Sequence, residues 1–194
     1  MINKSNFKDL IIKLGFTDNG TLFVKEFAQF SCSLSVDFVN EKLIYPTSIV
    51  GRERNDSFSQ DENFVVFECV NRLLEKGYRP EHIELEKVWT LGHIQKSGRA
   101  DICVYNKDKS AMLFIIECKS AGREYNKALK NTLNDGAQLF SYWQQEQSTK
   151  WLCLYQSDYA NDEVSYKATT INCSDDKNIE DLAKKDKTIK LYSS

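Results

Sequence analysis

Two apolar runs joined by a short polar turn constrain the fold of this chain more than any other feature. The first is DICVY at residues 101–105, the second is AMLFIIECK at residues 111–119, and the five residues NKDKS separate them. Short apolar runs bounded by polar turns are typical of buried strands, and so short a connection favours neighbouring strands in one sheet. The second run ends in Glu117, Cys118 and Lys119, which predicts a buried strand that closes on two charged side chains.

Helices and further strands are predicted around this pair. A helix begins near Gln60 and ends at Lys76, because Gly77 stops it and Pro80 follows. The other expected elements are a helix over 124–147 with a weak point at 134–136, strands over 84–91, 150–157 and 163–171, and a short helix over 178–186. This order predicts an α/β fold with a mixed central sheet flanked by helices.

The N-terminal part of the chain is predicted to be an addition to that core. A helix over 4–16 is expected to end at Gly15, and strand-like runs follow at 21–27, 33–40 and 42–46. We therefore expect a helix and hairpin in residues 1–58, packed on a core formed by residues 59–194. A chain of 194 residues fits one domain with a sizeable core, so we expect one compact domain overall.

Composition excludes several classes of protein. Charged residues make up 28% and apolar residues 41%, and no apolar run approaches the ~20 residues that span a bilayer. The N-terminus lacks the features of a signal peptide, so we expect a cytoplasmic protein without a membrane partner. None of the six cysteines forms a CxxC motif or lies in metal-ligand spacing with the two histidines, which favours free thiols over a zinc site.

The charge balance neither requires nor excludes a nucleic-acid partner. The formal net charge is −2, which gives no overall basic surface. A local basic patch is compatible with that value, because acidic residues elsewhere can offset it. The candidate patch consists of Arg99, Lys119, Arg123, Lys127 and Lys130.

The charged strand end has the composition of a metal-dependent hydrolytic site. Side chains alternate along a strand, so Glu117 and Lys119 point the same way, and Asp101 opens the neighbouring strand. Asp101 and Glu117 are therefore expected to meet at one end of the sheet. Two nearby carboxylates repel each other unless a cation lies between them, and hard oxygen ligands suit Mg²⁺. A lysine beside them could polarise a water for attack on phosphorus. The alternative is an ordinary ion pair at a strand end.

Asp101, Glu117 and Lys119, on adjacent strands after a helix, resemble the active-site motif of the PD-(D/E)XK nuclease superfamily. Ala100 replaces the proline of that motif, at a position that varies in the family. The resemblance implies a restriction-endonuclease-like core in which Asp101 and Glu117 bind Mg²⁺ or Mn²⁺ and the carbonyl of Cys118 completes the ligand set. It also implies that Lys119 orients or activates the attacking water.

The segment AQLFSYWQQ adds a second element. Gln138 and Tyr142 are four residues apart and share one helix face. They resemble the QxxxY element of type I restriction subunits and RecB-like nucleases, where the pair helps to position the DNA and the active site. Ser120 and Arg123, shortly after the lysine, are further candidates for DNA contact. Tyr142 could instead be a core aromatic residue, and Ser120 could instead form a turn or a cap.

The helix that begins near Gln60 resembles the first core helix of the type I restriction N-terminal nuclease domain, which often has a glutamate facing the metal. On a helical wheel Glu62 lies on the apolar side and Glu68 on the polar side, so Glu62 is the candidate ligand, either directly or through water. Alternatively, Ser59 and Glu62 form a capping box, in which Glu62 bonds only the backbone of Ser59.

These resemblances predict a Mg²⁺-dependent endonuclease domain of a restriction–modification system that hydrolyses phosphodiester bonds of double-stranded DNA. The stretch VDFVNEKLIYP, residues 36–46, resembles the N-terminal region of restriction–modification proteins. We therefore expect this chain to be part of a larger polypeptide or complex with methylase, translocase or specificity parts. Two alternatives stay open: a DNA repair or junction nuclease with the same core, and a nuclease-like module that binds DNA or protein without cutting.

Overall fold

Two β-sheets and a set of packed helices form the protein in a computed structural model that describes residues 1–52, 56–89, 98–135, 137–184 and 192–193. The smaller sheet is antiparallel, with the order β1 (Thr17–Asp18), β2 (Phe23–Phe27), β3 (Cys32–Asp37) and β4 (Lys42–Ile44). The larger sheet has the order β10 (Tyr192–Ser193), β9 (Glu163–Asn172), β8 (Trp151–Ala160), β7 (Met112–Cys118), β6 (Arg99–Tyr105) and β5 (Ile83–Val88).

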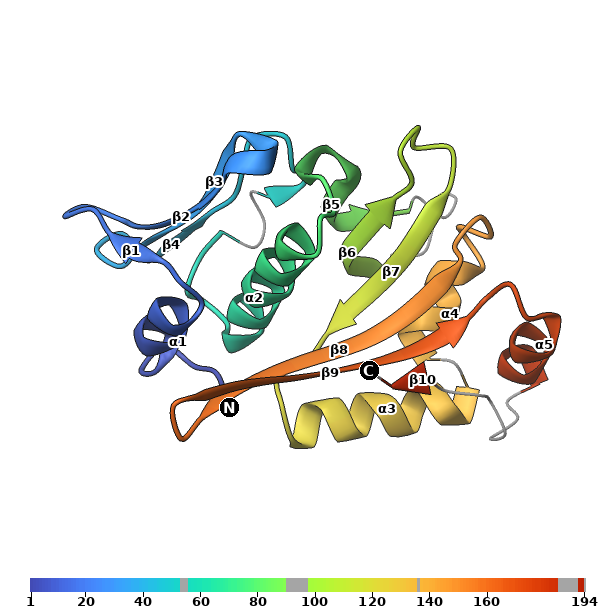
Figure 1. The fold of residues 1–194 in the computed structure, drawn as a ribbon. Helices are drawn as coiled ribbons and strands as arrows, with labels where there is room; N and C mark the ends of the chain where they lie inside the picture. Colours follow the sequence, from blue (N-terminus) through green and yellow to red (C-terminus); the bar gives the residue numbers. More distant parts are fainter. Residues whose placement is uncertain (53–55, 90–97, 136, 185–191, 194) are drawn as a thin grey trace.

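The larger sheet is mixed, as the sequence predicts. β7 and β8 pair in parallel and the other neighbouring strands pair antiparallel. Parallel neighbours need a crossover connection, and here the crossover consists of α3 (Arg123–Asp135) and α4 (Ala137–Trp143). Figure 1 shows α2 (Asp61–Glu75) on one side of this sheet and α3 with α4 on the other. The α/β fold class with a helix-flanked mixed sheet is therefore confirmed.

Helix α2 lies between the two sheets, which explains its burial (Figure 1). A helix with only one buried face keeps its charged side chains on the other face, whereas α2 packs on both sides. Glu68 and Asn71 are fully buried as a result. The prediction that Glu68 lies on a polar, outward side is therefore wrong: its carboxylate accepts a hydrogen bond from the Tyr155 hydroxyl of β8 and pairs with Arg72, so Glu68 faces the larger sheet.

The N-terminal segment differs from the predicted helix and hairpin. α1 (Phe7–Lys13) is shorter than the expected helix over 4–16, because the side chains of Asn3 and Asn6 bond nearby backbone groups and compete with helical hydrogen bonding. A four-stranded sheet forms in place of one hairpin, since β1 and β4 extend the β2–β3 pair on both sides. Apolar residues of this segment, among them Phe7 and Leu34, belong to the same core cluster as α2. The division of the chain into an addition of residues 1–58 and a core of residues 59–194 stays a prediction.

The remaining elements agree with the sequence in kind and differ at their ends. The predicted helix over 124–147 forms two helices, α3 and α4, and Gly136 between them lies outside the described residues. The predicted strand over 84–91 corresponds to β5, and its residues 90 and 91 also lie outside them. The last predicted helix corresponds to α5 (Asp176–Lys184). All six cysteines are free thiols, as expected. In the described part of the chain, no helix is long and apolar enough to cross a membrane.

Candidate active site

The register of β6 and β7 brings Asp101 and Glu117 to one end of the larger sheet. Ile102 pairs with Ile116, so Asp101 and Glu117 are the next residues across this antiparallel pair. The backbone N–H of Cys118 donates a hydrogen bond of 2.7 Å to Oδ2 of Asp101. The expectation that the two strands are neighbours and that these carboxylates meet is confirmed.

Lys119 links the strand end to the first turn of α2. Its ammonium lies 2.8 Å from Oε1 of Glu117 and 3.1 Å from Oε2 of Glu62. Its backbone N–H donates to the carbonyl of Tyr155 at 2.8 Å, which continues the β7–β8 ladder by one residue. Glu117 is only 4% exposed. The strand-end ion pair is therefore present and lies mostly out of the solvent, a setting that enzymes use to perturb charged groups, and its catalytic role stays a prediction.

The electrostatics of the cluster reflect crowded carboxylates in a place with little water. Burial, followed by repulsion from Glu117, raises the pKa of Asp101 above its usual value. Burial also raises the pKa of Glu117, and the neighbouring Lys119 partly offsets that rise. Burial alone would lower the pKa of Lys119, but the charges of Glu117 and Asp101 outweigh it and raise that pKa. Lys119 is therefore held as a cation.

Glu62 contacts the cluster through Lys119. Both of its carboxylate oxygens accept hydrogen bonds from the Lys119 ammonium, at 3.2 and 3.1 Å. The N-cap of α2 is Gln60, whose side chain makes no capping bond, so Ser59 is not the cap that the capping-box alternative requires. The helical-wheel argument thus places Glu62 correctly, while its role as a metal ligand stays a prediction.

The donor set fits a hard divalent cation that keeps part of its water shell. Among the described residues, no three side chains of His, Cys, Asp or Glu gather so as to hold a metal ion alone. Asp101 and Glu117 provide two carboxylates, and Mg²⁺ is usually held by one or two carboxylates together with water and substrate phosphate. The thiol of Cys118 belongs to the core on the α2 side, so only its backbone carbonyl is a candidate ligand.

Tyr142 is both a core residue and part of the cluster. Its side chain is fully buried, and its hydroxyl donates to the carbonyl of Arg99 at 2.5 Å and lies 3.2 Å from Oε2 of Glu117. Burial, followed by the charge of Glu117, raises the pKa of Tyr142, and a hydrogen bond with Gln138 acts in the opposite direction. The prediction that Gln138 and Tyr142 share one helix face is confirmed, since both project from α4 to this site.

Two residues that the sequence did not single out hold Tyr142 in place. The ring of Trp89 stacks on the ring of Tyr142, with centroids 5.5 Å apart. A Cβ atom added at Gly98 would lie 2.5 Å from Cε1 of Tyr142, so only glycine fits there. Nothing local in the sequence marks either contact, because both join segments more than 40 residues apart.

Gly98→Ala should therefore damage the site through Tyr142. The added methyl group overlaps a ring that is buried and stacked, so we expect a loss of about 1–3 kcal/mol in the free energy of unfolding. Urea denaturation measures that loss. Gly122→Ala is a control of a different kind, because its Cβ meets no atom within 4 Å and its cost comes only from a positive φ of 87°. If Gly98→Ala were as stable as the wild type while Gly122→Ala were less stable, the close approach of Gly98 to the Tyr142 ring would be wrong.

A polar cavity of about 340 Å³ opens beside the cluster, between the sheet and the two crossover helices. Glu117, Lys119 and Gln138 line it, together with Lys127 and Asn131 of α3. Arg123 lies at the exposed start of α3, and the carbonyl of Ser120 accepts the N–H of Tyr125 at 3.3 Å. Arg123 is thus the first residue of α3, one of the helices that line the cavity, and Ser120 lies in the turn before that helix.

Next to the cluster, the buried carboxylate of Glu86 forms an ion pair with Arg99, whose side chain is exposed. Glu86 is only 5% exposed. It has a φ of 55°, and the β5–β6 pairing skips it between Leu85 and Lys87. This irregularity turns Glu86 toward Arg99, whose carbonyl holds Tyr142.

Asp101→Asn should stabilise the metal-free protein at neutral pH. The pKa of Asp101 is raised in the folded state, so its contribution to stability is complete at low pH and is lost as the pH rises through that folded value. Asparagine keeps an oxygen for the Cys118 N–H and carries no charge. We expect a gain of about 0.5–2 kcal/mol in the free energy of unfolding at pH 8, shrinking toward pH 5. Urea denaturation with a chelator present measures this gain. An equal loss of stability at pH 5 and at pH 8 would contradict the repulsion between the carboxylates of Asp101 and Glu117.

A model of the family described as "Type I restriction enzyme R protein N terminus (HSDR_N)" matches residues 62–160 of the chain. The match covers slightly more than half of the sequence. It begins at Glu62 and ends with β8, so it contains each side chain of the cluster described above. A search of the curated proteins found no match.

Proposed function

Since the chain belongs to the family of type I restriction enzyme R protein N termini, we propose that Asp101, Glu117 and Lys119 form a Mg²⁺-dependent endonuclease site that cuts double-stranded DNA. The observation that carries this proposal is the buried carboxylate pair, with a lysine fixed beside it, at the ends of two adjacent strands. The same arrangement supports membership of the PD-(D/E)XK superfamily. The family places the matched region in a restriction–modification context.

Each group of the cluster has a separate role in phosphodiester hydrolysis. Asp101, Glu117 and the carbonyl of Cys118 would hold the cation, which supplies a Lewis acid that offsets charge developing on the phosphate. Lys119, held protonated by the two carboxylates, orients the attacking water and stabilises the phosphate oxygens rather than acting as a base. The water oxygen bonds to phosphorus and its proton passes to solvent, while the bond to the leaving oxygen breaks and that oxygen takes up a proton from solvent, which leaves one phosphate end and one hydroxyl end.

Glu62 and Tyr142 position the reacting groups in this proposal. Glu62 contacts the Lys119 ammonium together with Glu117, so that the lysine is held by two carboxylates. Tyr142 fixes Glu117 through its hydroxyl and is itself fixed by the Arg99 carbonyl. Such fixed geometry is the main means by which enzymes accelerate phosphoryl transfer.

The polar cavity and α3 provide the surface for the DNA strand. Arg123, Lys127 and Lys130 lie at positions that follow one face of α3, and all three are exposed. None of them has an ion-pair partner among the described residues. Unpaired cations on the helix that lines the cavity fit phosphate contacts, Gln138 lines the cavity itself, and Ser120 lies in the turn before α3.

A plasmid-cleavage assay tests the proposal. Supercoiled DNA should be nicked or linearised by the wild-type chain with Mg²⁺ or Mn²⁺, should remain intact with a chelator, and should remain intact with Asp101→Ala. Asp108→Ala, which removes an exposed carboxylate in the β6–β7 turn, is the matched control and should cut as the wild type does. Equal cutting by Asp101→Ala and wild type would overturn the assignment. DNA binding by the wild type with no cutting under any of these conditions would favour the silent binding module.

We further propose that this activity operates within a restriction–modification complex. The family name refers to one protein of a type I restriction enzyme. Methylase, translocase and specificity parts are therefore the expected partners, and recognition of a DNA sequence is assigned to them rather than to the cluster described here.

A further inference from the structure

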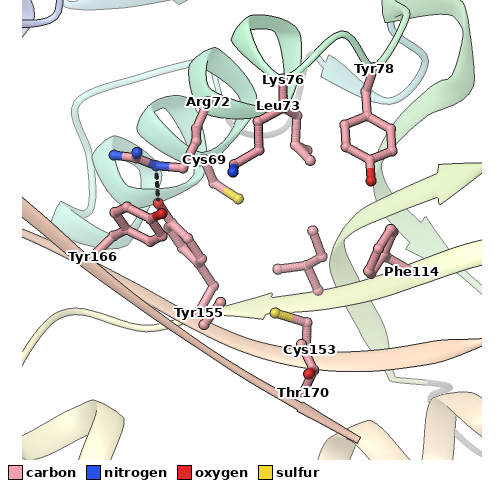
Figure 2. A pocket seen from close by; sticks show the side chains of 12 residues that line it. Cys69, Arg72, Leu73, Lys76, Tyr78, Phe114, Cys153, Tyr155, Tyr166 and Thr170 are labelled. Atoms are coloured by element: carbon pink, nitrogen blue, oxygen red, sulfur yellow. Dashed lines mark hydrogen bonds between the residues drawn. The ribbon is translucent and has the colours of Figure 1, made fainter. Parts of the chain in front are cut away.

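A second cavity, which we call the α2 cavity, lies between α2 and the sheet face opposite to that of Glu117. Its volume is about 210 Å³. Cys69 and Leu73 of α2 form one wall, and Phe114 of β7 and Cys153 of β8 form the floor (Figure 2). Ile116 of β7 also lines the cavity. A cavity of about 150 Å³ with an apolar lining is known to hold a benzene ring, so the α2 cavity has room for one ring with a substituent.

Aromatic side chains stand at both ends of the α2 cavity. Tyr78 meets Phe114 edge to face, with centroids 6.0 Å apart and an interplanar angle of 88°. At the other end, Tyr155 and Tyr166 are nearly parallel, with centroids 6.1 Å apart. Aromatic rings prefer such offset and edge-on partners, so this lining favours a planar ring over a flexible aliphatic chain.

The charge at the opening of the α2 cavity is positive. Arg72 is paired with the buried Glu68, and its guanidinium lies 3.7 Å from the ring centroid of Tyr166. Lys76 has no ion-pair partner among the described residues. Figure 2 shows its side chain descending from α2 with the ammonium toward the cavity. One uncompensated cation above an apolar floor complements a single anionic group.

We propose that the α2 cavity binds a small planar aromatic or heteroaromatic ring that carries one anionic group. The ring lies on Phe114 and Cys153, and the anion faces Lys76. An aromatic carboxylic acid has this chemistry and fits within the cavity, whereas a nucleoside monophosphate has the same two groups and would extend through the opening, and the experiment below distinguishes them. The site is separate from the proposed nuclease activity, although Ile116 precedes Glu117 and the carbonyl of Tyr155 accepts the Lys119 N–H.

The test is a titration followed by backbone amide chemical shifts, with benzoate, benzyl alcohol and adenosine monophosphate as probes. Benzoate should shift the amides of Cys69, Phe114 and Cys153 in a saturable way and should bind more tightly than the neutral benzyl alcohol. Lys76→Met keeps the apolar stem and removes the charge, so it should weaken benzoate about threefold, as expected for an exposed ion pair, and leave benzyl alcohol unchanged. Lys109→Met, in the β6–β7 turn, is the control and should change neither.

A second variant separates filling of the α2 cavity from loss of charge. Ala168→Leu places extra carbon atoms at the lining and should remove binding of both benzoate and benzyl alcohol while the spectrum stays dispersed. Tighter binding of adenosine monophosphate than of benzoate would identify a nucleotide, and the reverse order would identify an aromatic acid. The proposal is overturned if benzoate and benzyl alcohol bind equally, if neither shifts these amides at millimolar concentration, or if Ala168→Leu binds as the wild type does.

Discussion

Lys119→Met should lower the rate of DNA cleavage by about three orders of magnitude, the scale of a positioned group that acts on the attacking water. Lys119 is the cation that contacts both Glu117 and Glu62, so its removal leaves no ammonium beside these carboxylates in the part of the chain that the structure describes. Lys119→Arg should restore the charge without restoring the rate, because a planar guanidinium cannot reproduce the geometry of an ammonium. Initial rates of plasmid nicking at saturating Mn²⁺ measure both effects.

A measurement of metal binding distinguishes loss of the lysine's role in the reaction from loss of the metal site. The Lys119→Met variant keeps Asp101 and Glu117, so it should bind metal at least as tightly as the wild type once the competing cation is gone. Lys107→Met, an exposed change in the β6–β7 turn, should leave both rate and binding unchanged. Nicking by Lys119→Met within a few-fold of the wild-type rate would show that this lysine has no part in the chemistry.

Arg72→Met should destabilise the fold strongly. Glu68 is fully buried, and Arg72 is its ion-pair partner. The hydroxyl of Tyr155 donates to Glu68 at 2.6 Å and accepts from Nε of Arg72 at 3.0 Å, so all three form one network. Removing one member of a buried pair leaves an uncompensated charge, which costs about 3–5 kcal/mol. Urea denaturation at neutral pH measures this cost.

The double variant Glu68→Gln/Arg72→Met shows whether the uncompensated charge is the cause. Removing both charges should recover much of the stability lost in Arg72→Met, since no buried carboxylate remains unpaired. The exposed pair Arg79–Glu81 provides the contrast, and Arg79→Met should change stability by less than about 1 kcal/mol. Additive losses in the double variant would mean that the network stabilises by packing alone.

The sequence predicts the part of the site that neighbouring strands create. The short turn between residues 101–105 and 111–119 limits the pairing of β6 and β7, and the alternation along β7 then puts Glu117 and Lys119 on one face. Gln138 and Tyr142 follow from helical spacing in the same way. These relations are local, so short-range geometry is enough to derive them.

The parts that the sequence does not predict depend on contacts between distant segments. Glu68 is buried against β8, where it bonds the Tyr155 hydroxyl and pairs with Arg72, and a helical wheel drawn for one helix cannot include a partner more than 80 residues away. The packing of Gly98 and Trp89 against Tyr142 arises only when β5, β6 and α4 come together. The φ of 55° at Glu86 likewise has no local signal, because this residue type does not favour a left-handed conformation.

Calorimetric titration of Mn²⁺ into the purified chain tests the central claim most directly, because it requires neither a DNA substrate nor a partner protein. We predict one site in the wild type, and loss of binding in both Asp101→Asn and Glu117→Gln. The control Asp108→Asn should bind as the wild type does. If the wild type bound no metal even with DNA present, or if both variants retained the site, the cluster would be a buried structural ion pair and the nuclease assignment would be wrong.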